Sequence, residues 1–166
     1  MRRVTVGRSR LLLALALAVL SVASTLYLLG SNGDANLPRR PTGFMVVGGT
    51  AQAFSLVATD EPSREKGLMG ANITESTFAL FAFPTAARHS FWMKGTASSL
   101  DIVWINGTIV GGTVVFVLMN LPLCTVSSCP IYTPSAPANF AIEGAAGFAA
   151  RLEIANGTRI AFSFAP

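Results

Sequence analysis

The segment 88–94 (RHSFWMK) concentrates side chains that could bind a ligand. In a β-strand, successive side chains point to opposite faces. One face would then carry two cations, a hydroxyl and an indole, from Arg88, Ser90, Trp92 and Lys94. Such a face could form the floor of a site for an anionic or sugar-like ligand. The other face, with His89 between apolar side chains, fits a core.

Lys94 and Asp101 bracket a short polar turn (residues 95–99) that contains Thr96. Two opposite charges beside apolar runs could hold a ligand or take part in catalysis. Alternatively, the two residues form an ion pair or a cap that fixes the turn. The candidate ligand-binding residues are therefore Arg88, Trp92, Lys94, Thr96 and Asp101.

Known catalytic sets are difficult to assemble from this chain. A serine triad would need His89, the only histidine, but the neighbouring Ser90 would point to the opposite face. A Ser-Lys dyad of Lys94 with Ser98 or Ser99 remains open. No spacing pairs the carboxylates for glycoside hydrolysis, and no glycine-rich phosphate loop is present. We therefore assign no catalytic residue, metal or cofactor.

The two cysteines, Cys124 and Cys129, are spaced C-x4-C in a loop rich in Pro, Ser and Thr. A disulfide is expected if the domain is exported, since oxidising compartments permit one. Free or redox-active thiols are a second reading. Zinc would need two further ligands, and the chain has one His and no other Cys.

Residues 11–29 contain no charged side chain and predict a transmembrane anchor. Nineteen helical residues span roughly 28 Å, close to the ~30 Å hydrocarbon core of a bilayer. Four arginines precede the segment, so residues 1–10 are expected in the cytoplasm and everything after residue 29 outside it. The alternative is a signal peptide cleaved near Val22-Ala23-Ser24, which would release the protein.

The formal charge of +4 belongs to the N-terminal part. From Pro41 onward, six basic residues stand against seven acidic ones, a net charge of −1. This balance argues against a nucleic-acid surface. Three glycosylation sequons, at Asn72, Asn106 and Asn156, agree with export.

A Gly-, Pro- and Asn-rich stretch, residues 30–42, predicts a flexible linker before one domain, residues 43–166. Asn106-Gly107, between two apolar runs, predicts a hairpin turn. Short helices are expected over 60–69 and 145–152, and a long loop over 120–139. Strands are expected over 43–47, 52–58, 77–83, 88–94, 101–105, 108–110, 113–119, 140–143 and 158–164. The expected fold is mainly β, a compact sandwich or barrel-like domain with two short helices, behind one N-terminal transmembrane helix.

Several sequence blocks together resemble the prokaryotic family called Domain of Unknown Function 192, over roughly Thr50 to Phe164. The blocks are EPSREKGLM (61–69), FWMKGT (91–96), Leu100-Asp101, CTVSSCP (124–130) and FAIEGAAG (140–147). The resemblance implies a single β-dominated domain, often behind a signal or anchor, without an established activity. Three positions depart from the usual family pattern: Ala71 replaces an Arg, Gly95 an Asn and Ser99 a Pro.

These observations lead to a membrane-anchored domain outside the cytoplasm that binds a small ligand or an envelope protein. Its membrane partner would be lipid, contacted through residues 11–29. The alternative is a hydrolase-like enzyme of the cell envelope that uses Lys94 and Asp101.

Overall fold

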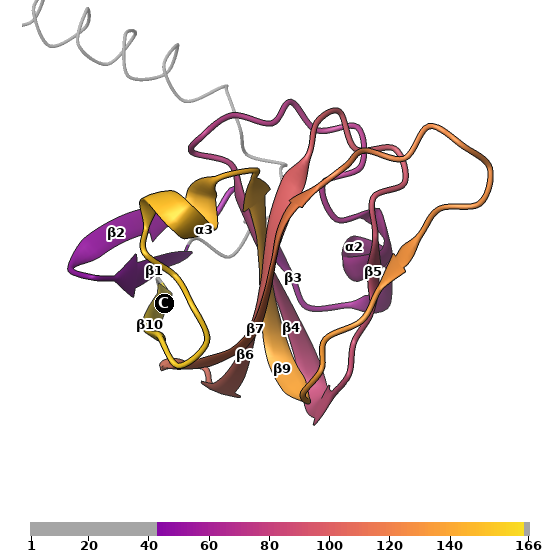
Figure 1. The fold of residues 1–166 in the computed structure, drawn as a ribbon. Helices are drawn as coiled ribbons and strands as arrows, with labels where there is room; N and C mark the ends of the chain where they lie inside the picture. Colours follow the sequence, from indigo (N-terminus) through magenta and orange to yellow (C-terminus); the bar gives the residue numbers. More distant parts are fainter. Residues whose placement is uncertain (1–42, 165–166) are drawn as a thin grey trace, which may run out of the picture. The chain divides into compact units, whose positions relative to one another are not determined.

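The structure is a computed structural model and describes residues 43–164 (Figure 1). The strands are β1 (Gly43–Val47), β2 (Thr50–Ala53), β3 (Leu56–Ala58), β4 (Phe78–Ala87), β5 (Phe91–Trp92), β6 (Leu100–Thr108), β7 (Gly111–Leu121), β8 (Ile131–Tyr132), β9 (Ala138–Ala145) and β10 (Arg159–Phe164). The helices are α2 (Glu61–Lys66) and α3 (Phe148–Arg151). Neither is long or apolar enough to cross a bilayer. The predicted cytoplasmic segment, anchor and linker all lie outside the described residues.

Eight strands form one sheet in the order β2-β1-β10-β7-β6-β9-β4-β3. All neighbouring pairs are antiparallel except β3 and β4. The sheet curls into a half-barrel, and β5 and β8 form a small second sheet (Figure 1). The prediction of a mainly β domain with two short helices is confirmed. The main strands form one curled sheet rather than two stacked sheets.

Each face of the central strands packs into its own hydrophobic core. On β6, Ile102 and Trp104 enter a core below α2, which we call the α2-side core. The alternating residues Val103 and Ile105 enter a core that includes Phe148 of α3, the α3-side core. Because both faces of β6, β9 and β4 are covered, these strands read as nearly continuous apolar runs.

Helix α2 begins where the sequence predicts, but it is shorter. Asp60 caps it: its carboxylate accepts the Ser63 amide proton at 2.8 Å, and the Ser63 hydroxyl lies 3.3 Å from the Asp60 amide. The helix ends at Gly67, which has a φ of +44°. Glycine tolerates this positive φ and so permits the helix to stop after six residues. Residues 67–69, predicted as helix, form turns.

The predicted hairpin forms between β6 and β7, but its turn is not at Asn106-Gly107. Gly107 instead pairs with Gly112 inside the ladder, and the turn residues are Ile109 and Val110. The side chain of Asn139 holds Gly107 in the strand by accepting its amide proton and donating to its carbonyl, both at 2.9 Å. These tertiary contacts override the local turn preference of Asn-Gly.

Three other predicted boundaries differ from the structure. The strand expected over 52–58 is interrupted between Ala53 and Leu56. The break expected at Gly111-Gly112 is absent, because β7 starts at Gly111. Finally, the long loop 120–139 contains β8, which pairs with β5.

Asp101, a predicted site residue, is a fully buried structural residue. One carboxylate oxygen accepts the amide proton of Asn120 at 2.7 Å. The other accepts those of Gly147 and Ala149, at 2.9 and 3.0 Å. The carboxylate thus ties the start of β6 to the end of β7 and to the first turn of α3. It does not cap the 95–99 turn.

We predict that Asp101→Ala lowers the free energy of unfolding by about 3 kcal/mol or more, because three backbone amides lose a charged acceptor. Urea unfolding measures the loss. Asp60→Ala, which removes an exposed cap, is the control and should cost clearly less. Equal losses for the two variants would contradict the structural role of Asp101.

Candidate functional site

The segment 88–94 has the predicted alternation, although only Phe91 and Trp92 form regular strand. Arg88, Ser90, Trp92 and Lys94 are exposed, while Phe91 and Met93 are buried. Beyond β5, Lys94 forms a single bridge with Cys124. The segment is therefore held between β8 and the cysteine loop.

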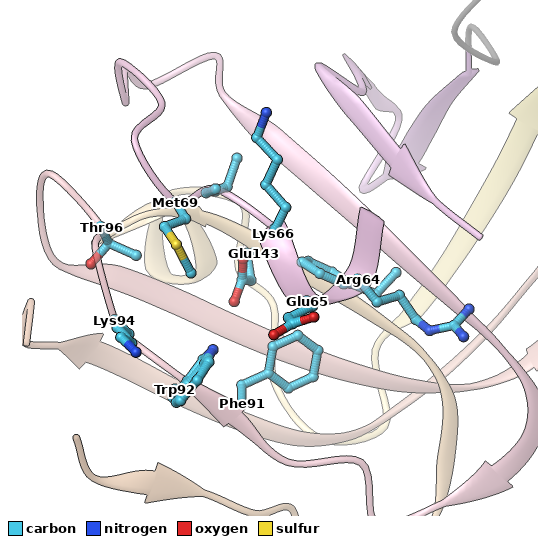
Figure 2. A pocket seen from close by; sticks show the side chains of 12 residues that line it. Arg64, Glu65, Lys66, Met69, Phe91, Trp92, Lys94, Thr96 and Glu143 are labelled. Carbon is cyan, nitrogen blue, oxygen red and sulfur yellow. The ribbon is translucent and has the colours of Figure 1, made fainter. Parts of the chain in front are cut away.

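Two adjoining pockets lie between this segment and α2. The first is a narrow slot of about 20 Å³, lined by Lys66, Met69, Lys94, Thr96 and Glu143 among others (Figure 2). The second is a wider, shallower groove of about 270 Å³. The two share five lining residues: Arg64, Glu65, Phe81, Phe91 and Trp92. Together they form a groove with aromatic walls and a polar slot at one end, which we call the α2 groove.

Glu143 is the buried polar group of the slot. It lies in β9, opposite Ala79 of β4 and Ile102 of β6, with only 4% of its surface exposed. Figure 2 shows its carboxyl directed into the slot, between Met69 and Glu65. No hydrogen bond or ion pair with another described residue offsets the loss of water. Burial therefore raises the pKa of the Glu143 carboxyl to about 8.

Glu143 is not among the residues predicted to form the site, although its position in the sequence is unusual. The residue is the single charged group in the apolar run 138–149, and it lies in the FAIEGAAG block of the family resemblance. A charge in the middle of a buried strand is costly unless it is paired or functional.

Two cations lie against aromatic rings along the groove. The Lys94 Nζ is 5.0 Å from the centroid of the Trp92 ring, which itself is 37% exposed. The Arg64 guanidinium is 5.4 Å from the Phe83 ring. Arg64 also donates to the carbonyls of Thr59 and Ala82, at 2.6 and 3.1 Å. Arg64 is thus fixed in position, whereas no hydrogen bond to a described residue fixes the Lys94 ammonium.

The other predicted site residues have mixed positions. Thr96 lines the slot, and its hydroxyl donates to the Met93 carbonyl at 3.0 Å. Ser90 lines the wider part of the groove. Arg88 is not among the lining residues of either pocket. Its Nε donates to the Pro134 carbonyl at 2.7 Å.

The structure does not bring Lys94 and Asp101 together. Glu143 pairs with Ile102, whose side chain is in the α2-side core, so the slot is on that face of the sheet. Asp101 is the neighbouring residue of β6, and its carboxylate points to the opposite face, toward α3. A site that uses both Lys94 and Asp101 is therefore not supported by this geometry.

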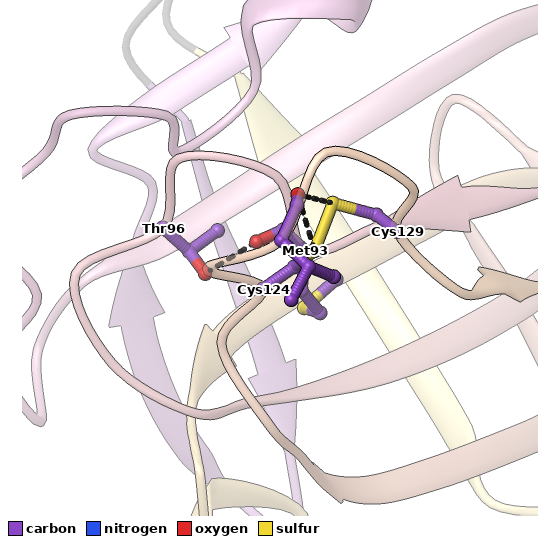
Figure 3. The surroundings of a disulfide bond; sticks show 5 residues. Met93, Thr96, Cys124 and Cys129 are labelled. Carbon is purple, nitrogen blue, oxygen red and sulfur yellow. Dashed lines mark hydrogen bonds between the residues drawn. A yellow bond between two sulfur atoms is a disulfide. The ribbon is translucent and has the colours of Figure 1, made fainter.

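The predicted disulfide between Cys124 and Cys129 is present (Figure 3). The Cys124 amide donates to the Met93 carbonyl at 3.1 Å, beside the Lys94 bridge. The disulfide loop thus buttresses the segment that carries Trp92 and Lys94. Among residues 43–164, no three His, Cys, Asp or Glu side chains group closely enough to hold a metal ion.

The three sequon asparagines, Asn72, Asn106 and Asn156, are exposed. Gly95, one of the departures from the family pattern, has a φ of +66°. A Cβ added there would lie 2.6 Å from Met69 Cγ. Asn and Gly are the residues that adopt this left-handed conformation most readily, so the backbone of the turn suits either residue, but an Asn here would require the Met69 side chain to move.

Comparisons with known proteins agree with the fold. A family model described as DUF192, "Uncharacterized ACR", matches residues 45–162. The chain belongs to this family. The DUF192 match contains all ten strands except the ends of β1 and β10. No curated protein matches the chain.

Two solved structures share the DUF192 fold. One is a Sinorhizobium meliloti protein described as a candidate transcription regulator, with a TM-score of 0.61 and 23% identity. The match covers 77% of this chain and 96% of that one. The other is a protein of unknown function from Novosphingobium aromaticivorans, with a TM-score of 0.59, 21% identity, and coverage of 72% and 82%. The first relative thus consists almost entirely of this fold.

Glu143 predicts a pH dependence of stability. Its folded pKa of about 8 lies above the ordinary value of 4.5. Between these values the folded state binds the extra proton, so stability falls as pH rises, by up to about 1.4 kcal/mol per pH unit. Glu143→Gln should remove this slope and be more stable than wild type at pH 8. Urea unfolding from pH 5 to 9 measures both effects; parallel curves for the two proteins would contradict the assignment.

Proposed function

We propose that the domain binds a small hydroxyl-bearing ligand, sugar-like and neutral or anionic, in the α2 groove. The observation that carries the proposal is the Glu143 carboxyl, which faces an accessible slot from a buried strand and has no hydrogen bond to another described residue. Native proteins rarely leave such a group unsatisfied, and the exceptions often mark a function.

The size of the two pockets indicates how a ligand would fit. The slot holds about 20 Å³, enough for one water molecule and little more. A ligand would therefore insert a single hydroxyl or carboxylate oxygen there. The rest of the molecule would lie in the 270 Å³ groove against Trp92 and Phe91. An exposed indole is a suitable surface for a sugar ring, which has an apolar face and a polar edge.

The charges of the groove favour a neutral or anionic ligand. At neutral pH a Glu143 carboxyl with a pKa of about 8 is largely protonated and can donate a hydrogen bond. Lys94, Lys66 and Arg64 contribute three positive charges, against Glu61 and Glu65. A ligand oxygen in the slot would therefore meet a donor and a positive field.

The enzyme alternative loses its original residues, because both Asp101 oxygens are occupied by backbone amides. A carboxyl with a raised pKa is nevertheless suited to general acid catalysis. A hydrolase in this groove would therefore use Glu143. Whether the bound compound is recovered unchanged distinguishes binding from turnover.

The location belongs to the same proposal. The apolar segment 11–29 with its arginine flank would keep the chain in the membrane, and the disulfide suits an oxidising compartment. The net charge of −1 from Pro41 onward gives no reason to transfer a role in transcription from the Sinorhizobium relative.

The test is a thermal-shift screen of residues 41–166 against mono- and disaccharides, uronic acids and small carboxylates. We expect at least one compound to stabilise the wild type. Trp92→Ala and Glu143→Gln should each weaken its binding by about tenfold or more, roughly 1.4 kcal/mol. Ile131→Ala is the matched control, because Ile131 pairs with Trp92 and is exposed but lines neither pocket.

Three results would change the proposal. If no compound shifts the wild type, binding of this ligand class is wrong. If a shift survives both groove substitutions, the site is wrong. If chromatography shows that the bound compound is converted by wild type but not by Glu143→Gln, the domain is an enzyme.

A further inference from the structure

The β6–β7 turn carries two apolar side chains that contact little of the domain. Ile109 is 73% exposed and Val110 71% exposed. Two-residue hairpin turns normally contain Gly, Asn or Asp. A β-branched pair here neither favours the turn nor packs into either core. Proteins often place residues that disfavour the local backbone conformation at functional sites, where the function compensates for the loss of stability.

This turn lies at the end of the sheet where the chain enters the domain. The Phe162 amide donates to the Val110 carbonyl at 3.0 Å, so β10 runs directly beside the turn. Two residues further, Phe164 pairs with Gly43, the first described residue. Gly43, where the described chain begins, is therefore two strands away from the turn. Neighbouring strands are about 4.8 Å apart. Phe44, 40% exposed, follows Gly43. We call Phe44, Ile109 and Val110 the tip patch.

The charges around the tip patch are one-sided. Arg159 at the start of β10 is exposed and lines the same shallow depression as Val110. None of the seven acidic residues after Pro41 lies in β1, β2, β7 or β10. This end of the domain could therefore approach an anionic surface without repulsion.

We propose that the tip patch docks on the phospholipid bilayer from which the chain emerges. The proposal rests on the membrane anchor of the proposed function. As the flexible linker that its composition predicts, the thirteen-residue stretch 30–42 would have a root-mean-square span of about 20 Å. A tether this short raises the effective concentration of the surface, so a weak contact by three side chains is sufficient.

Docking would also orient the ligand site. Lys94 forms a bridge with Cys124, which follows the end of β7. The last residue of β7, Leu121, pairs with Leu100 at the start of β6. Lys94 therefore lies near this end of the two strands. The hairpin turn is at the other end of the same two strands. With the tip patch on lipid, the Lys94 side of the α2 groove would face away from the membrane.

The test places a nitroxide label on the full chain, reconstituted in vesicles of phosphatidylcholine with anionic phosphatidylglycerol. Ile109→Cys puts the label in the tip patch. Ser76→Cys is the control, exposed next to the opposite end of the sheet. We expect the label at position 109 to be several-fold more accessible to oxygen, and less accessible to a nickel chelate, than the label at 76. Equal accessibility at the two positions would overturn the proposal.

A second measurement separates docking from the anchor. In the same vesicles, with the label at 109, Phe44→Ser with Val110→Ser should shift the label towards the values at 76. Met119→Ser with Val126→Ser removes two exposed apolar side chains outside the tip patch and should leave it unchanged. If the chain leaves the vesicles in alkaline carbonate, the anchor is wrong and the docking proposal fails with it; ligand binding in the α2 groove would be unaffected.

Discussion

Burial of two carboxyl groups on opposite faces of two paired strands, β6 and β9, is the constraint on which this domain depends. Asp101 and Glu143 lie in adjacent rows of β6 and β9, and both are buried. The protein satisfies Asp101 with three backbone amides from two distant segments. No described residue makes a hydrogen bond to the Glu143 carboxyl. Asp101 therefore stabilises the fold and lines neither pocket of the α2 groove. Glu143 instead places a polar group at the end of the slot.

This difference determines what each carboxyl can do. A carboxylate that accepts three amide protons on the α3 side is committed to structure, because any ligand would have to replace those bonds. On the α2 side, burial alone sets the pKa of Glu143 to about 8, so the group can give or take a proton near neutral pH. This carboxyl has no hydrogen bond to a described residue. It lies at the end of a groove lined by the Trp92 indole, in a segment that the cysteine loop supports.

The sequence predicts more of the fold than of the site. Apolar runs and alternation located nearly every strand, and the spacing of segment 88–94 correctly separated its exposed and buried faces. The hairpin turn was misplaced because Asn139, thirty-two residues away, holds Gly107 in the ladder. Similarly, Asp101 and Lys94 are close in sequence, and only the sheet shows that the Asp101 carboxylate is on the face away from the slot. The sequence marks Glu143 as a lone charge in an apolar run, but only the pairing of β9 with β4 and β6 shows that it faces the slot.

The central claim is that the Glu143 carboxyl is protonated at neutral pH while open to the α2 groove. Carbon-13 NMR of the labelled glutamate side-chain carboxyls in residues 41–166 tests it directly, with Glu143→Gln identifying the resonance. The account predicts one carboxyl that titrates with a midpoint near 8, well apart from the other glutamates. A midpoint near 4.5 for this resonance would show that the group is solvated or paired, and would contradict the account.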